Sequence, residues 1–259
     1  MKQIAPLVYQ WSRYDAESGI DHNGYFVQPA VGAPGASIDP VALHPADEEH
    51  IARLGGAAAV LFTSAGLARE RADAAAHCAE RFRCPVRVPA GEHVGVAAVA
   101  GAESFRTEDA LPVGLVAVTV PDSAAPDETA FRDAAGSVFV GRGVLGAPPG
   151  QVSLPAGLDG EAAARAARGL RTLLTLPINR LLSSTGFPVL REPAAAIQEL
   201  LYRHDPEAFI LRSGESVWGR SGGQGVRFRQ RMAEYSRPLG LRAIDFCLRE
   251  VPPGRQDFP

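Results

Sequence analysis

The side chains best suited to acid, base or metal chemistry are scattered along this sequence. No two histidines form a His-x-His pair or lie four residues apart, so none are spaced to share a metal on one strand or helix turn. The three cysteines lack a Cys-x-x-Cys spacing and a surrounding histidine cluster, which favours reduced structural thiols. The histidines are His22, His44, His50, His77, His93 and His204, and the cysteines are Cys78, Cys84 and Cys247.

Composition and charge narrow the class of protein. The chain has 259 residues, 46% of them hydrophobic, and its 26 Lys and Arg against 29 Asp and Glu leave a net charge of −3. This balance gives no long-range field to attract a polyanion, which argues against a nucleic-acid partner. No stretch approaches the roughly 18 uninterrupted apolar residues of a membrane span, and the start lacks the apolar core of a signal peptide. We therefore expect a cytoplasmic protein with one main domain and no membrane partner.

The elements that must position any site alternate between strands and helices. Asn23-Gly24 is a turn-type pair before an aromatic and β-branched run, and residues 36–40 resemble a second strand, so a hairpin is expected. Periodicity predicts, in order, a helix over 47–54, a strand over 57–62, a helix over 65–82, strands over 85–89, 113–120 and 137–141, a helix over 161–176, a strand over 179–184 and a helix over 193–203.

The predicted helix over 65–82 is the longest of these elements. Its repeated Arg, Glu and Asp residues are assigned to solvent, and Leu67, Ala74, Cys78 and Phe82 to the buried side. With the strands on either side it gives the strand, helix, strand order of an α/β layered domain. Two β-rich halves, each followed by helices, suit two packed sheets with helices outside them.

Short motifs in a fixed order resemble the metallo-β-lactamase superfamily over about residues 7–192. They are Asn23-Gly24-Tyr25, Ile38-Asp39-Pro40, the strand ending at Thr63, Val140-Gly141, and Gly186-Phe187-Pro188-Val189-Leu190. The resemblance implies an α/β fold, a four-layer αββα sandwich with a short C-terminal β extension. In that superfamily a His-x-His-x-Asp-His loop after a strand ending in Thr ligates two metals, because imidazoles and carboxylates suit Zn²⁺.

The positions that match the family's metal ligands carry other residues here. The loop after Thr63 runs from Ser64 to Arg69 without a histidine or a carboxylate. Ser123 stands where the Gly-His-x-x-Gly-Glu turn has its histidine, Arg142 where the bridging aspartate is expected, and Thr185 where the last histidine is expected. Ser, Thr, Gly and Arg cannot supply the deprotonated ligands that a metal needs. The resemblance therefore implies a degenerate site with no metal and no other cofactor.

A site without metal remains open. If the loops keep their family positions, hydroxyl and guanidinium groups converge and could bind a carboxylate or phosphate. The candidate pocket residues are His22, Ser64, Arg69, Ser123, Arg142, Ser184 and Thr185. We expect a binding or scaffold protein for a small anionic ligand or partner. The alternative is a hydrolase of ester, thioester or lactam-type substrates, in which a serine takes its base from His22 or from the turn over 122–128.

The carboxylates of that turn, Asp122, Asp127 and Glu128, are interpreted as a solvated loop rather than as ligands. Residues 1–205 are assigned to the main domain, 206–225 to a Gly- and Ser-rich linker, and 226–259 to a C-terminal β extension. The extension resembles the first strands of a cupin domain. The alternation of Ile244, Phe246 and Leu248 gives it an apolar face, so a homo-oligomer, most simply a dimer, is expected to form through strand addition.

Overall fold

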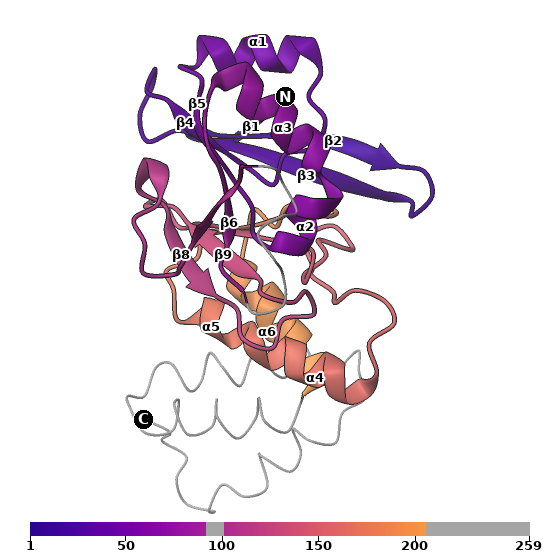
Figure 1. The fold of residues 1–259 in the computed structure, drawn as a ribbon. Coiled ribbons are helices and arrows are strands. Elements are labelled where there is room, and N and C mark those ends of the chain that lie inside the picture. The colour runs from indigo at the N-terminus through magenta and orange to yellow at the C-terminus, as the bar shows by residue number, and fades with distance from the viewer. Residues whose placement is uncertain (92–100, 206–259) are drawn as a thin grey trace, which may run out of the picture. The chain divides into compact units, whose positions relative to one another are not determined.

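Two β-sheets with helices outside them make up the main part of this chain (Figure 1). The computed structural model describes residues 1–91 and 101–205. The first sheet has seven strands in chain order, antiparallel from β1 to β4 and parallel from β4 to β7. Its strands are β1 (Lys2–Ala5), β2 (Val8–Asp15), β3 (Ile20–Val27), β4 (Gly35–Ile38), β5 (Ala57–Leu61), β6 (Val86–Pro89) and β7 (Glu103–Phe105).

The second sheet has four strands in the order β11-β10-β9-β8. β10 and β11 are parallel, whereas β8, β9 and β10 pair antiparallel. The strands are β8 (Val116–Thr119), β9 (Thr129–Arg132), β10 (Ser137–Val140) and β11 (Arg180–Ser183). Periodicity missed β1, β2, β7 and β9, and the predicted strand over 113–120 is shortened by a 3₁₀ turn at Pro112–Gly114. The αββα sandwich expected from the sequence is confirmed.

Helices cover the outer faces of both sheets (Figure 1). α1 (Pro45–Arg53) contributes Ile51 to the cluster that includes Tyr9, Trp11 and Phe26, while two further helices bury a separate cluster against β5 and β6. Those two are α2 (Ala65–Glu70) and α3 (Ala72–Phe82), and α4 (Gly160–Gly169) and α5 (Arg171–Leu174) lie on the side of the second sheet. The helices predicted over 65–82 and 161–176 are each two helices rather than one.

The break between α2 and α3 falls at Arg71. Its backbone has φ −111° and ψ 27°, outside the helical range, so the chain changes direction there. Arg71 is 7% exposed although every arginine of this segment was assigned to solvent. The prediction of one continuous helix with a charged outer face was therefore wrong at the residue that turns inward.

The hairpin of β3 and β4 is confirmed, but the turn is not where the sequence suggested. Asn23 and Gly24 lie within β3, and Gly24 pairs with Trp11 of β2. A Cβ on Gly24 would lie 2.5 Å from Trp11 Cζ2, and the indole nitrogen donates to Val41 O at 2.9 Å. Glycine is thus required here by the ring that covers it rather than by a turn.

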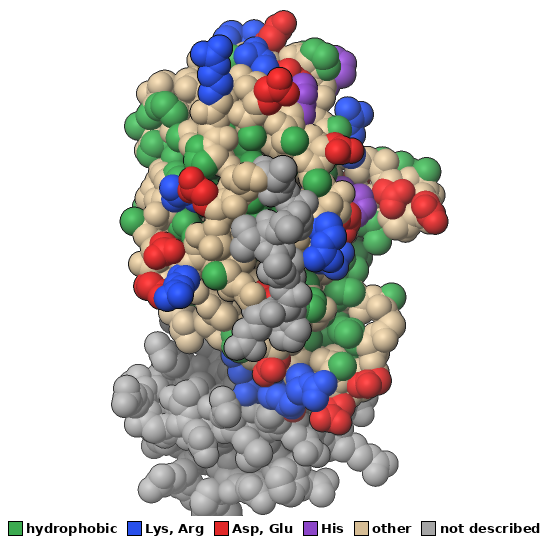
Figure 2. All heavy atoms as spheres, in the orientation of Figure 1, with side chains coloured by type: hydrophobic (Ala, Val, Ile, Leu, Met, Phe, Trp, Pro, Cys, Tyr) green, Lys and Arg blue, Asp and Glu red, His purple; other side chains and the backbone are tan. Residues whose placement is uncertain are grey.

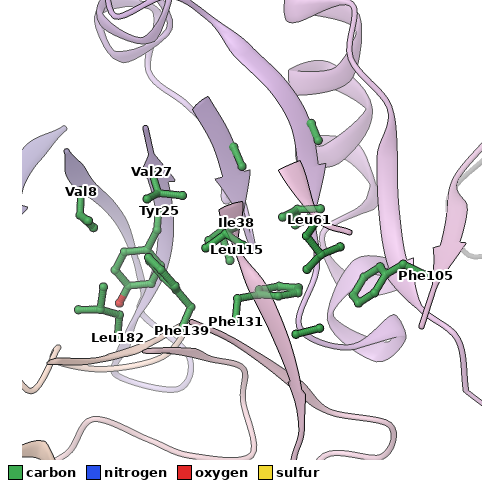
Figure 3. Packing of buried hydrophobic residues seen from close by; sticks show 14 of the residues in the cluster. Val8, Tyr25, Val27, Ile38, Leu61, Phe105, Leu115, Phe131, Phe139 and Leu182 are labelled. Atoms are coloured by element: carbon green, nitrogen blue, oxygen red, sulfur yellow. The ribbon is translucent and has the colours of Figure 1, made fainter. Parts of the chain in front are cut away.

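Aromatic pairs join the two sheets across the core (Figure 3). Tyr25 of β3 meets Phe139 of β10 edge to face with centroids 5.5 Å apart, and Phe105 of β7 meets Phe131 of β9 at 5.7 Å. Such pairs add about 0.5 to 1.5 kcal/mol each beyond the area they bury. All four rings are at most 3% exposed, so the interior between the sheets is apolar up to the strand ends.

The C-terminal part of the described chain is α6 (Pro193–His204), where a helix was expected. The chain divides into two compact units, Met1–Ile197 and Gln198–Pro259, with the boundary inside this helix. The predicted linker, the extension that resembles a cupin start, and the oligomer built on it lie outside the described residues. In residues 1–91 and 101–205 no helix is long and apolar enough to cross a membrane. On the face drawn in Figure 2, basic and acidic side chains are interspersed.

The contact between Gly24 and Trp11 gives the first prediction. Gly24→Ala should destabilise the fold by about 1 to 3 kcal/mol, because the added methyl must displace a buried indole. Gly160→Ala is the matched control, since no atom lies within 4 Å of its Cβ position and its φ is not positive. The control should change the free energy of unfolding by less than about 0.5 kcal/mol. Urea unfolding of both variants measures this, and equal effects would contradict it.

Candidate functional site

Buried polar residues gather at one edge of the sandwich, where β4, β5, β10 and β11 end. We call this set the strand-end cluster. Each member is at most 7% exposed, although the adjacent core is apolar. The members are Asn23, Asp39, Thr63, Ser64, Arg71, Glu128, Ser183, Ser184 and Thr185. Buried polar groups need partners, so their bonds define the site.

The guanidinium group of Arg71 holds three chain segments together. Nη1 donates to Asn23 O at 2.9 Å and to Asp39 O at 2.6 Å. Nη2 donates to Ser184 O at 3.1 Å and faces His22 Nδ1 at 3.3 Å. Because a guanidinium can only donate, His22 Nδ1 acts as the acceptor, which puts the proton of the neutral ring on Nε2. One side chain thus links β3, the end of β4 and the end of β11.

Asn23 makes a second connection between the sheets. Its backbone N–H donates to Ser184 O at 2.9 Å, and its side-chain Nδ2 donates to Ser183 O at 2.9 Å and to Gly186 O at 2.6 Å. Tyr25, two residues after Asn23 in β3, donates its hydroxyl hydrogen to Ser183 O at 2.5 Å. The loop after β11 is therefore fixed to β3 by side chains as well as by main chain.

Asp39 is a buried carboxyl bound by a single residue. Oδ1 accepts the Thr63 N–H at 2.8 Å and Oδ2 accepts the Thr63 hydroxyl at 2.7 Å. Burial raises the pKa of Asp39 to about 6, although the Arg71 charge and the two Thr63 bonds oppose the shift. Thr63 in turn accepts the Thr129 N–H on its carbonyl at 2.7 Å, which joins the end of β5 to the start of β9.

Glu128 is the second buried carboxyl, and its burial was not expected. It is 2% exposed, its Oε1 accepts the Gly141 N–H at 2.7 Å, and its Oε2 accepts a short hydrogen bond from the Ser123 hydroxyl. Burial raises the pKa of Glu128 to about 7, and the nearby Asp39 adds to the shift. The interpretation of this turn as a solvated loop was therefore wrong for Glu128, whereas Asp122 is exposed.

Two glycines allow the chain after β10 to press against this carboxyl. A Cβ on Gly141 would lie 2.4 Å from Thr63 Oγ1, and a Cβ on Gly143 would lie 2.0 Å from Glu128 Oε2 and 2.3 Å from Ser123 Oγ. A side chain at Gly141 would have to displace Thr63, and one at Gly143 would have to displace Glu128 and Ser123. The Gly-Arg-Gly sequence thus has a steric reason that the sequence pattern alone did not reveal.

Arg142, between these glycines, points to a different part of the site. Its Nη1 forms an ion pair with Glu70 Oε2 at 2.7 Å, and both side chains are nearly half exposed. Its Nη2 is 3.3 Å from the position of a Cβ on Gly66, and Ser64 Oγ is 4.0 Å from that position. Ser64 accepts the Leu67 N–H at 3.2 Å and so caps α2.

The structure brings most of the candidate residues to this edge, in three groups. His22, Ser184 and Thr185 lie around Arg71, since Thr185 forms a bridge with His22 and Ser184 accepts from Arg71. Ser64 and Arg142 lie near Gly66, and Ser123 lies beside Glu128. Arg69 is exposed on α2. The Ser184 hydroxyl is fully buried, and its oxygen has no hydrogen-bond partner among the described residues.

Sequence reasoning missed Arg71, and it missed the burial of Glu128, which it treated as one acid of a solvated turn. The signal for Arg71 was present, because Leu67, Arg71, Ala75 and Cys78 follow one another at the spacing of one helix face and all four are buried. No comparable signal existed for Glu128, which lies in a loop and is buried only by the approach of the chain after β10.

A pocket of about 320 Å³ opens beside the carboxyl group of Glu128. Its walls come from the ends of β6, β7 and β8 and from the turn that contains Ser123 and Glu128. Thr107 and Thr119, which share a hydrogen bond of 2.7 Å, also line it. In the part of the chain that the structure describes, no three His, Cys, Asp or Glu side chains come together in a way that could hold a metal ion.

Comparison with known proteins agrees with this architecture. Residues 1–203 match the metallo-β-lactamase superfamily, and the chain belongs to that superfamily. No curated protein matches at a significant level.

Solved structures share the fold at low sequence identity. A metallo-β-lactamase from Pontibacter korlensis is similar with a TM-score of 0.58 at 14% identity, covering 77% of this chain and 95% of that one. A metallo-β-lactamase from Hirschia baltica is similar with a TM-score of 0.55 at 13% identity, over 77% of this chain and 94% of that one. A flavo di-iron protein mutant from Thermotoga maritima gives 0.53 at 14% identity over 78% of this chain, which spans 60% of that protein.

The bonds of Arg71 predict a large loss of stability on truncation. Arg71→Ala removes a donor from the buried carbonyls of Asn23, Asp39 and Ser184, of which the last keeps the Asn23 N–H. It also removes the charge that faces Asp39, so the free energy of unfolding should fall by about 3 kcal/mol or more. Arg69→Ala, two residues away and exposed, is the control and should stay within about 0.5 kcal/mol of the parent protein. Denaturant unfolding compares them, and similar small losses in both variants would refute the central role of Arg71.

The raised pKa of Glu128 predicts how stability changes with pH. Between pH 4.5 and about 7 the folded chain holds a proton at Glu128 that the unfolded chain has released, so stability falls as the pH rises through this window. Glu128→Gln should remove this part of the slope, and at pH 8 the variant should exceed the parent protein in stability by up to about 3 kcal/mol.

Glu17→Gln, at an exposed position, serves as the control for this experiment. Thermal unfolding from pH 4 to pH 8 measures all three proteins. Asp39 should leave a residual slope below about pH 6 in the Glu128 variant, because its pKa is raised in the same direction. An unchanged slope in Glu128→Gln would contradict the assignment.

Proposed function

We propose that this chain works without the dinuclear metal centre of its superfamily and binds a small anionic ligand, or an anionic group of a partner, at the strand-end edge. The observation that carries the metal-free part of the proposal is Arg71. Its guanidinium group is buried, permanently charged and bonded to three strand-end carbonyls. The protein therefore has its own fixed cation at the edge where its superfamily places metals.

The donor set of the cluster does not fit zinc. A zinc ion takes three or four deprotonated ligands at about 2 Å, and serine, threonine and arginine do not supply them. Both carboxyl groups are already engaged, Asp39 by Thr63 and Glu128 by Ser123 and Gly141. His22 is committed to Arg71 through Nδ1. No step of the proposed function passes through a metal.

Arg142 is the residue that we propose for anion binding. It is nearly half exposed, and Gly66, which has no side chain, lies beside its guanidinium. Glu70 already occupies one side of it at 2.7 Å, so an incoming carboxylate or phosphate must compete with that side chain. A bidentate bond to guanidinium is geometrically favoured for both kinds of anion. Arg69 adds positive charge from α2, the short helix that also contains Gly66 and Glu70.

The second candidate function is hydrolysis of ester, thioester or lactam-type substrates without zinc. One observation favours it. Ser123 donates its hydroxyl to Glu128 in the wall of a pocket, and this pair is the nucleophile and carboxylate base that such an activity needs.

The proposal predicts little metal in the purified protein. Zinc, iron and manganese should each be well below one ion per chain after dialysis, because residues 1–91 and 101–205 offer no set of ligands that would retain them. Elemental analysis measures this, and thermal unfolding with and without a chelator is the control. One ion per chain that survives dialysis, together with a fall in melting temperature on chelation, would overturn the proposal.

Anions should stabilise the fold by mass action. At a hundredfold excess over Kd, phosphate, citrate or an acyl-phosphate analogue should add about 2.7 kcal/mol to the free energy of unfolding. Arg142→Ala should abolish the shift, whereas Glu70→Gln should strengthen it because the competing carboxylate is gone. Melting curves over a ligand titration measure the effect. An equal shift in the Arg69→Ala, Arg142→Ala double variant would reject this site.

A further inference from the structure

Ser123 and Glu128 form a hydroxyl and carboxylate pair that faces a cavity. Both residues line the pocket of about 320 Å³, and the Ser123 hydroxyl donates to Glu128 Oε2 in a short bond. Glu128 is oriented from behind by the Gly141 N–H, which donates to Oε1 at 2.7 Å. We infer that Ser123 is the nucleophile and Glu128 the general base of an esterase that acts on small neutral acyl esters.

The hydrogen bonds around Ser123 leave its oxygen able to attack. A hydroxyl oxygen has one proton and two lone pairs. The proton is directed at Glu128, and one lone pair accepts the Ala125 N–H at 3.2 Å. The second lone pair has no partner among the described residues that line the pocket. This arrangement requires glycine at position 143, since a Cβ there would overlap both Ser123 and Glu128.

The environment of Glu128 suits a base that works near neutral pH. Burial and the neighbouring Asp39 raise its pKa to about 7, while Ser123, Gly141 and Gly143 lower it through hydrogen bonds. A carboxyl with this pKa is partly ionised at neutral pH and can both take up and return a proton. Asp39 itself does not compete for the serine proton, because both of its oxygens are bound to Thr63.

The walls of the pocket indicate the class of substrate. Phe105, Val120 and Pro121 give it an apolar surface for an acyl chain. Asp122 and Asp127 bring negative charge to the same walls and Arg106 brings one positive charge, so the walls are negative in sum and disfavour an acyl group that carries a carboxylate. The volume is at the lower limit of known ligand pockets, so a short acyl group fits better than a long one.

The reaction balances with water as the only co-substrate. Ser123 Oγ attacks the carbonyl carbon while its proton passes to Glu128, and the C–O bond to the leaving group breaks as Glu128 returns that proton to the departing alkoxide. Water then attacks the acyl-serine ester and gives a proton to Glu128. The bond to Oγ breaks, the serine recovers the proton, and a carboxylic acid is released.

Labelling with a fluorophosphonate and turnover of p-nitrophenyl acetate test this inference on the full chain. Mass spectrometry of the digested protein should place the label on Ser123. Ser123→Ala should lose labelling and turnover, and Glu128→Gln should slow both by about 100-fold or more. Glu128→Gln is also expected to be the more stable protein at pH 8, so a loss of activity there does not come from unfolding.

Two further serine variants and a second ester serve as controls. Ser153→Ala changes a serine outside the pocket and should keep full activity. The sequence Gly219-Arg220-Ser221-Gly222-Gly223, outside the described residues, matches the Gly-x-Ser-x-Gly pattern of other serine hydrolases, so Ser221→Ala tests the competing nucleophile. p-Nitrophenyl hemisuccinate, whose acyl group is charged, should turn over at least about tenfold more slowly than the acetate, which corresponds to 1.4 kcal/mol.

The inference rests on the proposed absence of a metal centre, and a chelator separates the two. Turnover that persists in chelator and depends on Ser123 and Glu128 supports both. Turnover that disappears with the metal overturns the proposed function as well as the inference. A metal-free protein that neither hydrolyses the acetate nor takes the label, or that is labelled on Ser221, overturns the inference alone.

Discussion

The buried guanidinium group of Arg71 is the interaction on which the edge of this sandwich depends. A charge in a protein interior is costly unless it is bonded and balanced, and Arg71 is bonded to three carbonyls and balanced by Asp39. The carbonyls belong to β3, to the residue after β4 and to the residue after β11, so the relative position of these segments is set by one planar group. The break between α2 and α3 falls at the same residue, whose side chain lies on the buried face with Leu67, Ala75 and Cys78.

The strand-end cluster holds one buried cation, Arg71, and two buried carboxyl groups. Asp39 interacts with both Arg71 and Glu128, and burial raises the pKa of Glu128 to about 7. A proton held at Glu128 leaves the cluster neutral in total, whereas its release leaves one uncompensated negative charge away from water. This is the physical reason why stability and proton transfer are connected at the same residue. The glycines at 141 and 143 contribute by allowing the main chain to supply a hydrogen bond where a side chain would not fit.

The polar groups around Arg71 and those around Ser123 differ in whether they face the protein interior or a pocket, and this difference bears on function. Around Arg71 nearly every polar group is satisfied within the protein, which makes this half a structural element that fixes the strand ends. Around Ser123 the groups face a pocket, and a hydroxyl, a carboxyl and an apolar wall lie within reach of a bound molecule. Arg142, paired with the exposed Glu70, lies at solvent and can exchange partners. Superfamily membership fixes the scaffold, and these local differences decide what chemistry the scaffold supports.

The sequence by itself determined the layered α/β fold, the hairpin of β3 and β4 and most of the helices, because hydrophobic periodicity and motif order are local properties. Only the tertiary structure decided that Arg71 turns inward and that Glu128 is buried. Both outcomes depend on which distant segment covers the residue, Asn23 and Ser184 for Arg71 and the chain at 141–143 for Glu128, and no periodicity within one segment records that contact.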